Sequence, residues 1–119
     1  MRGLVLFAAL ALSSAPALAT TVTLELPGTE PPSTTKVSYR CGDRTIPVTY
    51  INTPDNQFAV LSLGRETVVA VAVMSGSGAR YVGQHYQWWS KGTGAELTDL
   101  MQEGQAPLAC KSRAAAQAQ

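Results

Sequence analysis

Residues 36–74, KVSYRCGDRTIPVTYINTPDNQFAVLSLGRETVVAVAVM, decide the fold, because runs of β-branched and aromatic residues alternate there with turn residues. Four strand-like runs cover residues 36–41, 45–51, 58–63 and 67–74. Each run ends at a signal rich in Gly, Asn, Asp, Pro or Ser, the residues that turns favour. The last run is apolar on both alternating faces, so we expect it to be the strand most fully covered by its surroundings.

The chain beyond residue 74 continues in the same way. Four more short strands are predicted at residues 79–82, 86–90, 95–100 and 106–110. The connections are too short for crossovers, so neighbouring strands must be antiparallel. This spacing predicts an all-β sandwich or barrel of eight strands in one domain. We expect almost no helix, apart from a turn near residues 99–103.

Two flanking segments lie outside this pattern. Residues 20–35 are expected to form an N-terminal arm and linker, in which Thr21–Leu26 alternates like a strand before Pro27 and Gly28 interrupt it. The β domain is expected to span residues 36–110. The polar, alanine-rich residues 111–119 are expected to be a disordered tail.

Residues 1–19 have the pattern of a secretory signal peptide. Arg2 supplies a positive start, an apolar run follows, and Ala17-Leu18-Ala19 is a small-x-small cleavage site. We expect cleavage before Thr20 and export of a soluble protein. No cysteine follows the cleavage site directly, so we expect no lipid anchor and no membrane attachment.

The two cysteines, Cys41 and Cys110, lie near the two ends of the patterned region. In an exported protein they are predicted to form one disulfide. In the chain-entropy model, closing so long a loop stabilises the fold by about 4 kcal/mol. Two cysteines and one histidine are too few for a closed zinc site, so we expect no metal.

Composition and motifs argue against nucleic-acid binding and catalysis. Nine Lys and Arg residues balance eight Asp and Glu residues, so the basic surface that nucleic acid requires is missing. His85 is the one histidine and is expected to be an ordinary surface or half-buried residue. No glycosidase pair is expected, because the carboxylates lie in turns or alternate outward. These carboxylates are Asp43, Asp55, Glu66, Glu96, Asp99 and Glu103.

Two features are left over once folding is accounted for. The loop Ser75-Gly76-Ser77-Gly78 is longer than a hairpin requires, and Lys91 follows it after the pair Trp88-Trp89. The loop is either a flexible connection or a partner-binding element. The two tryptophans must point to opposite faces of their strand, so at least one is expected to be exposed or near a rim.

These residues resemble the MliC/PliC family of Gram-negative inhibitors of C-type lysozyme. The resemblance covers about residues 37–110 and rests on a Tyr-x-Cys start, a Ser-Gly-x-x-Tyr loop, a Trp-x-Lys-Gly turn and a late cysteine. These motifs are Tyr39-Arg40-Cys41, Ser77-Gly78-Ala79-Arg80-Tyr81, Trp89-Ser90-Lys91-Gly92 and Cys110. The resemblance implies an eight-stranded antiparallel β-barrel. The family includes membrane-bound and periplasmic inhibitors, and the lack of a cysteine after the cleavage site resembles the periplasmic branch. We expect neither enzymatic activity nor a cofactor.

The resemblance also implies a partner and a mechanism. The partner would be a C-type lysozyme, whose cleft holds one protonated and one ionised carboxyl group. Lys91 would engage the ionised carboxylate and Ser77 the acid, while Gly76 and Gly78 let the backbone approach closely. Arg80, Tyr81 and Trp89 would complete the lysozyme-binding surface.

Two further expectations follow from the same features. Residues 20–33 are expected to be unnecessary for inhibition, because the resemblance begins after them. The alternative function is a periplasmic module that binds a glycan or small ligand on an aromatic shelf of Tyr81, Tyr86 and Trp88 or Trp89. An inhibitor needs a protruding loop near Lys91, whereas a binding module needs a concave apolar pocket.

Overall fold

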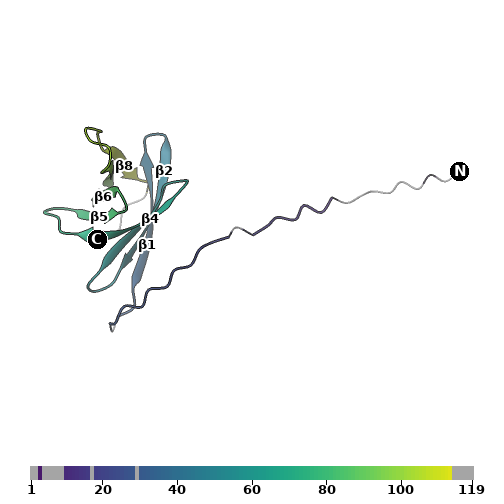
Figure 1. Cartoon of the computed structure of the whole chain (residues 1–119), viewed down its shortest axis with the longest axis horizontal. Helices are drawn as coiled ribbons and strands as arrows, with labels where there is room; N and C mark the ends of the chain where they lie inside the picture. Colours follow the sequence, from purple (N-terminus) through teal and green to yellow (C-terminus); the bar gives the residue numbers. More distant parts are fainter. Residues whose placement is uncertain (1–2, 4–9, 17, 29, 114–119) are drawn as a thin grey trace.

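The protein is a closed antiparallel β-barrel in which every strand pairs with the next along the chain (Figure 1). This computed structural model describes residues 3, 10–16, 18–28 and 30–113. The predicted barrel of eight strands is confirmed. The strands are β1 (Ser33–Cys41), β2 (Arg44–Asn52), β3 (Gln57–Ser62), β4 (Thr67–Val73), β5 (Ala79–Gly83), β6 (Tyr86–Lys91), β7 (Gly94–Asp99) and β8 (Leu108–Ser112).

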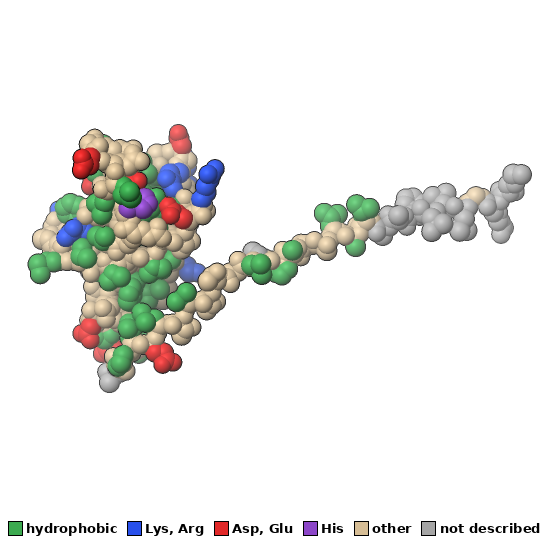
Figure 2. Space-filling model, in the orientation of Figure 1, with side chains coloured by type: hydrophobic (Ala, Val, Ile, Leu, Met, Phe, Trp, Pro, Cys, Tyr) green, Lys and Arg blue, Asp and Glu red, His purple; other side chains and the backbone are tan. Residues whose placement is uncertain are grey.

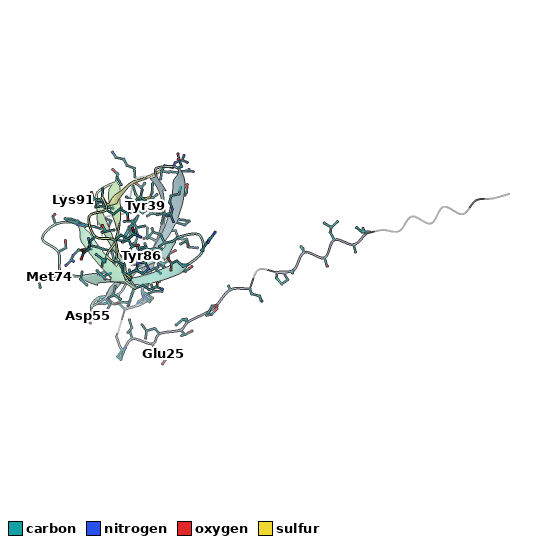
Figure 3. The ribbon with its side chains drawn as sticks, turned by 45° about the horizontal axis from the view of Figure 1, so that its top comes forward. Glu25, Tyr39, Asp55, Met74, Tyr86 and Lys91 are labelled. Carbon is teal, nitrogen blue, oxygen red and sulfur yellow. A yellow bond between two sulfur atoms is a disulfide. The ribbon has the colours of Figure 1, made fainter. Side chains whose placement is uncertain are left out.

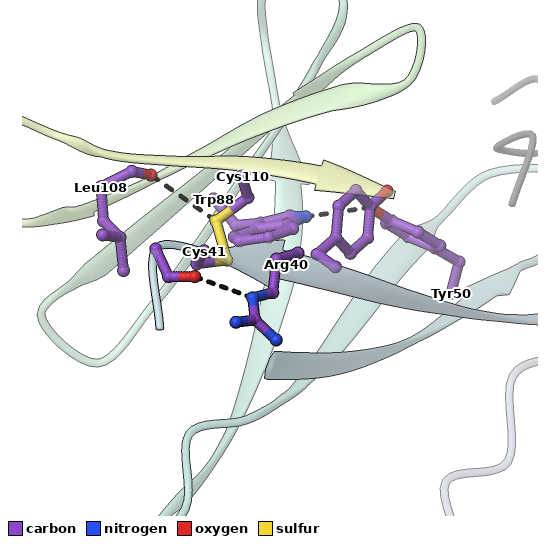
Figure 4. The surroundings of a disulfide bond; sticks show 8 residues. Arg40, Cys41, Tyr50, Trp88, Leu108 and Cys110 are labelled. Carbon is purple, nitrogen blue, oxygen red and sulfur yellow. Dashed lines mark hydrogen bonds between the residues drawn. A yellow bond between two sulfur atoms is a disulfide. The ribbon is translucent and has the colours of Figure 1, made fainter. Parts of the chain in front are cut away.

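The barrel closes where β8 returns to β1, and a disulfide lies at this junction. Only Tyr39 and Arg40 of β1 pair in register with β8 among the described residues. The predicted bond between Cys41 and Cys110 joins the two strands across a sequence separation of 69 residues (Figure 4). The covalent bond therefore reinforces a seam that has few backbone pairs.

Aromatic side chains that point inward fill the barrel. Trp88 is fully buried and its indole N–H donates to the Tyr50 hydroxyl at 2.9 Å (Figure 4). The Tyr50 and Tyr39 hydroxyls are 2.7 Å apart, and the Tyr39 ring packs edge-on against Trp88 at 4.9 Å. The polar ends of these large side chains thus find partners inside the core, as buried polar groups require.

The expectation that residues 67–74 form the most fully covered strand is wrong. Val68 and Ala70 of β4 are fully buried, but Val69, Val71 and Val73 are 59%, 42% and 41% exposed. Each strand of a single-layered barrel has one face in the core and one outside. Figure 2 shows hydrophobic side chains on the outside of the barrel, where no second layer covers them.

The two flanks also differ from the sequence-based expectation. Residues 21–26 form no strand in this structure, whereas β1 already begins at Ser33, because Ser33 pairs with Asn52 of the long strand β2. Lys111 and Ser112 belong to β8 and not to a tail, because Lys111 pairs with both Gly94 and Arg40. The expected disorder of residues 114–119 lies outside the described residues.

Candidate functional site

The Ser-Gly loop and Lys91 lie at the same end of the barrel. In this up-and-down barrel the β2–β3, β4–β5 and β6–β7 connections share one end, and the β1–β2, β3–β4 and β5–β6 turns share the other. The loop of residues 74–78 joins β4 to β5, and Lys91 ends β6. Lys91 Nζ donates to Ser77 Oγ at 3.4 Å, and both residues are exposed. Figure 3 shows Met74 pointing away from the barrel on the side that carries Lys91.

Short hydrogen bonds fix the backbone of the loop. The carbonyl oxygen of Ser77 accepts from Trp89 Nε1 at 2.9 Å and from Ser75 Oγ at 2.7 Å. Trp89 is half-buried on the outer face, so the prediction that one tryptophan lies near a rim is confirmed. The loop is therefore a braced element and not a flexible connection.

Gly78 is required by the backbone, whereas Gly76 is not. Gly78 has a φ of +65°, and a Cβ there would lie 2.5 Å from the Ser90 carbonyl oxygen and 2.8 Å from Trp89 Nε1. A Cβ on Gly76 would meet nothing within 4 Å. Only a glycine fits Gly78 without strain, because other residues rarely adopt this left-handed backbone.

Arg80 holds the start of the loop, whereas Tyr81 lies in the core beside it in sequence. The Arg80 guanidinium donates to the Met74 carbonyl at 2.8 Å and to Gln87 Oε1 at 3.2 Å, so it clamps the start of the loop to β6. Tyr81 is fully buried. Burial raises the pKa of its hydroxyl to about 12, so it stays protonated at neutral pH. Arg80 therefore positions the loop, Tyr81 belongs to the core, and Ser77, Gly78 and Lys91 are exposed.

A hollow of about 830 Å³ opens beside the loop. Tyr39 and Tyr81 are its aromatic residues, and Arg80, Lys91 and several other polar side chains share the lining. The hollow also contains Ser90, whose Oγ is buried and lacks a hydrogen-bond partner within the described chain. The lining is thus mixed, and not the apolar pocket that a small-ligand module would need.

The aromatic shelf expected for a glycan-binding module does not form. Trp88 and Tyr81 are buried in the core. Tyr86 lines a different hollow with Arg44 and Leu63, at the opposite end of the barrel. The side chains of the expected shelf therefore cannot form one exposed surface.

The Lys91 ammonium is exposed at the loop end, and the carboxylate contacts of Glu66 and Asp99 lie at the other end. Among the described residues, no carboxylate lies within ion-pair distance of Lys91. His85 Nδ1 lies 2.8 Å from Asp99 Oδ1, near the β5–β6 turn. This hydrogen bond, together with the Met101 N–H, holds the pKa of Asp99 below its usual range. His85 is half-buried, as expected, and is remote from the loop.

One carboxylate does contact an aromatic residue, which the sequence did not predict. Tyr86 donates its hydroxyl proton to Glu66 Oε1 at 2.7 Å, and this bond raises the pKa of Tyr86. Glycosidase chemistry needs two convergent carboxylates, and this contact involves one, that of Glu66. Among the described residues, no group of three His, Cys, Asp or Glu side chains could hold a metal.

Comparison with known sequences then assigns the family. A sequence model described as "Membrane-bound lysozyme-inhibitor of c-type lysozyme" matches residues 39–106. The chain belongs to the MliC family of lysozyme inhibitors. This membership confirms that it is not an enzyme.

Two curated MliC proteins are similar to this chain, and both are named membrane-bound lysozyme inhibitor of C-type lysozyme. The protein from Cupriavidus necator is 46% identical over 85 residues, which cover 70% of this chain and 68% of that protein. The protein from Pseudomonas aeruginosa is 38% identical over 94 residues, which cover 76% and 74%. The crystal structure of P. aeruginosa MliC in complex with hen egg white lysozyme superposes with a TM-score of 0.70 at 36% identity, covering 82% of this chain and all of that one.

The residues predicted from the sequence include the exposed Ser77, Gly78 and Lys91 of this candidate site, and also Arg80 and Trp89, which hold the loop. Ser75 was singled out only as part of the loop and Gln87 not at all, although their hydrogen bonds fix the loop and the clamp of Arg80. Gln87 could have been found from strand parity, since it shares the outer face with Trp89. The bond from Ser75 depends on the folded shape of the loop, which no sequence period indicates.

Proposed function

We propose that this chain inhibits C-type lysozyme by placing the loop of residues 75–78 and Lys91 in the catalytic cleft of the enzyme. The observation that carries this proposal is the pairing of an exposed ammonium and an exposed hydroxyl, Lys91 Nζ and Ser77 Oγ, 3.4 Å apart on neighbouring elements. Their contact is long for a hydrogen bond, so both groups can form better ones with a partner.

The chemistry of the pair matches the chemistry of the cleft. Lysozyme keeps one carboxyl group protonated and one ionised, as the standard account of its mechanism holds. The Lys91 ammonium would form a charge-assisted hydrogen bond to the ionised carboxylate. The Ser77 hydroxyl can donate or accept, so it suits the protonated acid. Both catalytic groups would then be occupied and water excluded from them.

The braced loop makes such binding efficient. Bonds from Trp89 and Ser75 hold the Ser77 carbonyl, and Arg80 holds the start of the loop. A loop already in its bound shape loses little conformational entropy on binding, which increases affinity without further contacts.

The same proposal includes export to the periplasm as a soluble protein, cleaved before Thr20. Both cysteines of the chain form the disulfide, which favours an oxidising compartment and leaves neither to carry a lipid. Cell fractionation and N-terminal sequencing test this part. An acylated protein in the membrane fraction contradicts it.

The decisive experiment removes each of the two groups. Lys91→Ala is expected to weaken inhibition by thirty-fold to several thousand-fold, because loss of one partner of a desolvated charge pair costs about 2–5 kcal/mol. Ser77→Ala is expected to cost about 1–3 kcal/mol, as for a buried hydrogen bond. Inhibition of lysozyme is measured by the clearing of a cell-wall suspension.

Arg65→Ala is the matched control, since it removes the same charge from an exposed turn at the opposite end of the barrel. It should inhibit like the unmodified protein. All three variants should melt normally in circular dichroism, because they alter exposed residues. If Lys91→Ala and Ser77→Ala both melt normally and inhibit as well as Arg65→Ala, insertion of this loop is not the mechanism.

A further inference from the structure

One stretch of the barrel wall lacks a neighbour. β1 pairs with β2 from Ser33 to Cys41 but with β8 only at Tyr39 and Arg40. The last contact on the β8 side is the bond from the Arg113 N–H to the Ser38 carbonyl at 3.1 Å. Within the described chain, residues 33–37 therefore have an open edge. Such an edge is a template for another strand.

The backbone groups that face this edge can be identified. In an antiparallel strand the N–H and C=O of one residue point to the same side, and so do those of every second residue. The Ser38 carbonyl faces β8. The backbone groups of Thr34 and Lys36 therefore face the open edge.

The arm of the same chain carries the complementary pattern. Its apolar residues Val22, Leu24 and Leu26 alternate with polar ones and are 84%, 67% and 41% exposed. Residues 21–26 form no regular structure, and the arm leads away from the lower end of the barrel in Figure 1. Within the described chain, a segment with an alternating apolar pattern is thus left without a partner.

We propose that residues 22–26 pair with residues 33–37 as an antiparallel ninth strand. With Leu26 opposite Ser33 and Val22 opposite Val37, the two segments are equally long and fill the open edge up to Ser38. Residues opposite each other share a face, so this register directs the apolar side of the arm inward, where Val37 already points.

The connection between the two segments suits a reversal of the chain. Pro27-Gly28 has the residues that a type II turn prefers at its centre. The chain bends at Glu30, and Figure 1 shows the arm and β1 running in different directions from the lower end of the barrel. On the outer face, Glu25 would lie diagonally across from Lys36, where opposite charges attract.

This strand would complete the barrel wall beside the candidate site. The Ser112 N–H donates to the Thr93 carbonyl at 2.8 Å, so the β6–β7 turn that follows Lys91 lies next to the open edge. Tyr39 of β1 and Lys91 both line the hollow beside the loop. The arm would line this side of the hollow and shield β1 from pairing with other chains, while the loop of residues 75–78 on the far side stays free.

Amide exchange in the exported protein, followed by NMR, tests the pairing. The Thr34 and Lys36 amides are expected to exchange at least about tenfold more slowly than amides of an open edge. Nuclear Overhauser contacts between the Hα protons of Leu24 and Thr35 are also expected, because that pair is not hydrogen-bonded and lies closest. Free exchange at Thr34 and Lys36 would overturn the proposal.

Two matched variants and one truncation identify which segment occupies the open edge of β1. Thr23→Pro removes an N–H that faces Lys36 and should abolish the protection, whereas Thr21→Pro lies outside the paired segment and should preserve it. Protection that survives Thr23→Pro would overturn the proposal. So would protection that disappears when residues 114–119 are deleted, which would make the tail the occupant, or protection that depends on a dimer detected by sedimentation.

Discussion

Replacing Gly78 by alanine tests whether inhibition requires the shape of the loop as well as its serine. Gly78 has a φ of +65°, and the added Cβ would approach the Ser90 carbonyl oxygen to 2.5 Å and Trp89 Nε1 to 2.8 Å. Backbone and indole must therefore shift, and the bond from Trp89 to the Ser77 carbonyl is the contact most directly threatened. Gly76→Ala is the matched control, because its Cβ would meet nothing within 4 Å.

The size of the effect follows from these contacts. A left-handed backbone costs a residue with a Cβ about 1–2 kcal/mol, and a lost hydrogen bond costs about 1 kcal/mol more. The sum of about 2–3 kcal/mol corresponds to a fall in affinity of about thirty-fold to 150-fold. The Ser90 carbonyl belongs to the backbone of β6, so the free protein can relieve the clash only by moving the loop, and a small fall in the melting temperature is expected. The complex needs the original shape, so most of the cost falls on binding.

The assay compares inhibition of a C-type lysozyme by the two variants and the unmodified protein, with circular dichroism melts as the folding control. Gly76→Ala is expected to stay within about twofold, as an unstrained surface change does. Equal inhibition by Gly78→Ala and Gly76→Ala, at equal melting temperatures, would show that the braced shape of the loop is irrelevant to binding.

Three further predictions concern the core and the arm. Tyr50→Phe should lower the free energy of unfolding, measured in urea, by about 1–3 kcal/mol, because it leaves the buried Trp88 N–H unpaired. Tyr86→Phe, at a half-buried site, should lower it by less. Equal losses of stability would contradict the role of the core network. Because burial raises the pKa of Tyr81 to about 12, the unfolded state loses its proton first, and the unfolding free energy should fall as pH rises above about 10. A flat profile there would count against this burial. A protein that begins at Ser33 should inhibit within about twofold of the exported form, and a large loss would give the arm a direct part in binding.

The number of strands was predictable because each turn is marked by residues at the turn itself. Gly42, Asn52, Gly64 and Gly92 mark ends of strands in the sequence, and the observed strands end within a few residues of these positions. The barrel's closure was not predictable from periodicity, because it depends on β8 returning to Tyr39 and Arg40. The same limit explains the wrong expectation for β4. A run of valines looks equally buried in a layered sheet and in a barrel, and only the closed topology shows which face meets water.

The candidate site, too, was predictable from sequence only in the features that local residues determine. Ser77, Gly78 and Lys91 could be singled out from sequence, because the loop exceeds what a hairpin needs and the motifs resemble a known family. What makes them a unit is the register Arg80↔Trp89, which brings the end of the loop against β6 and lets Trp89 reach the Ser77 carbonyl. Register is set by all the strands together, so neither the brace nor the distance from Lys91 to Ser77 follows from the motif alone. A substitution that shifts the β5–β6 register should therefore weaken inhibition even when Ser77, Gly78 and Lys91 are unchanged.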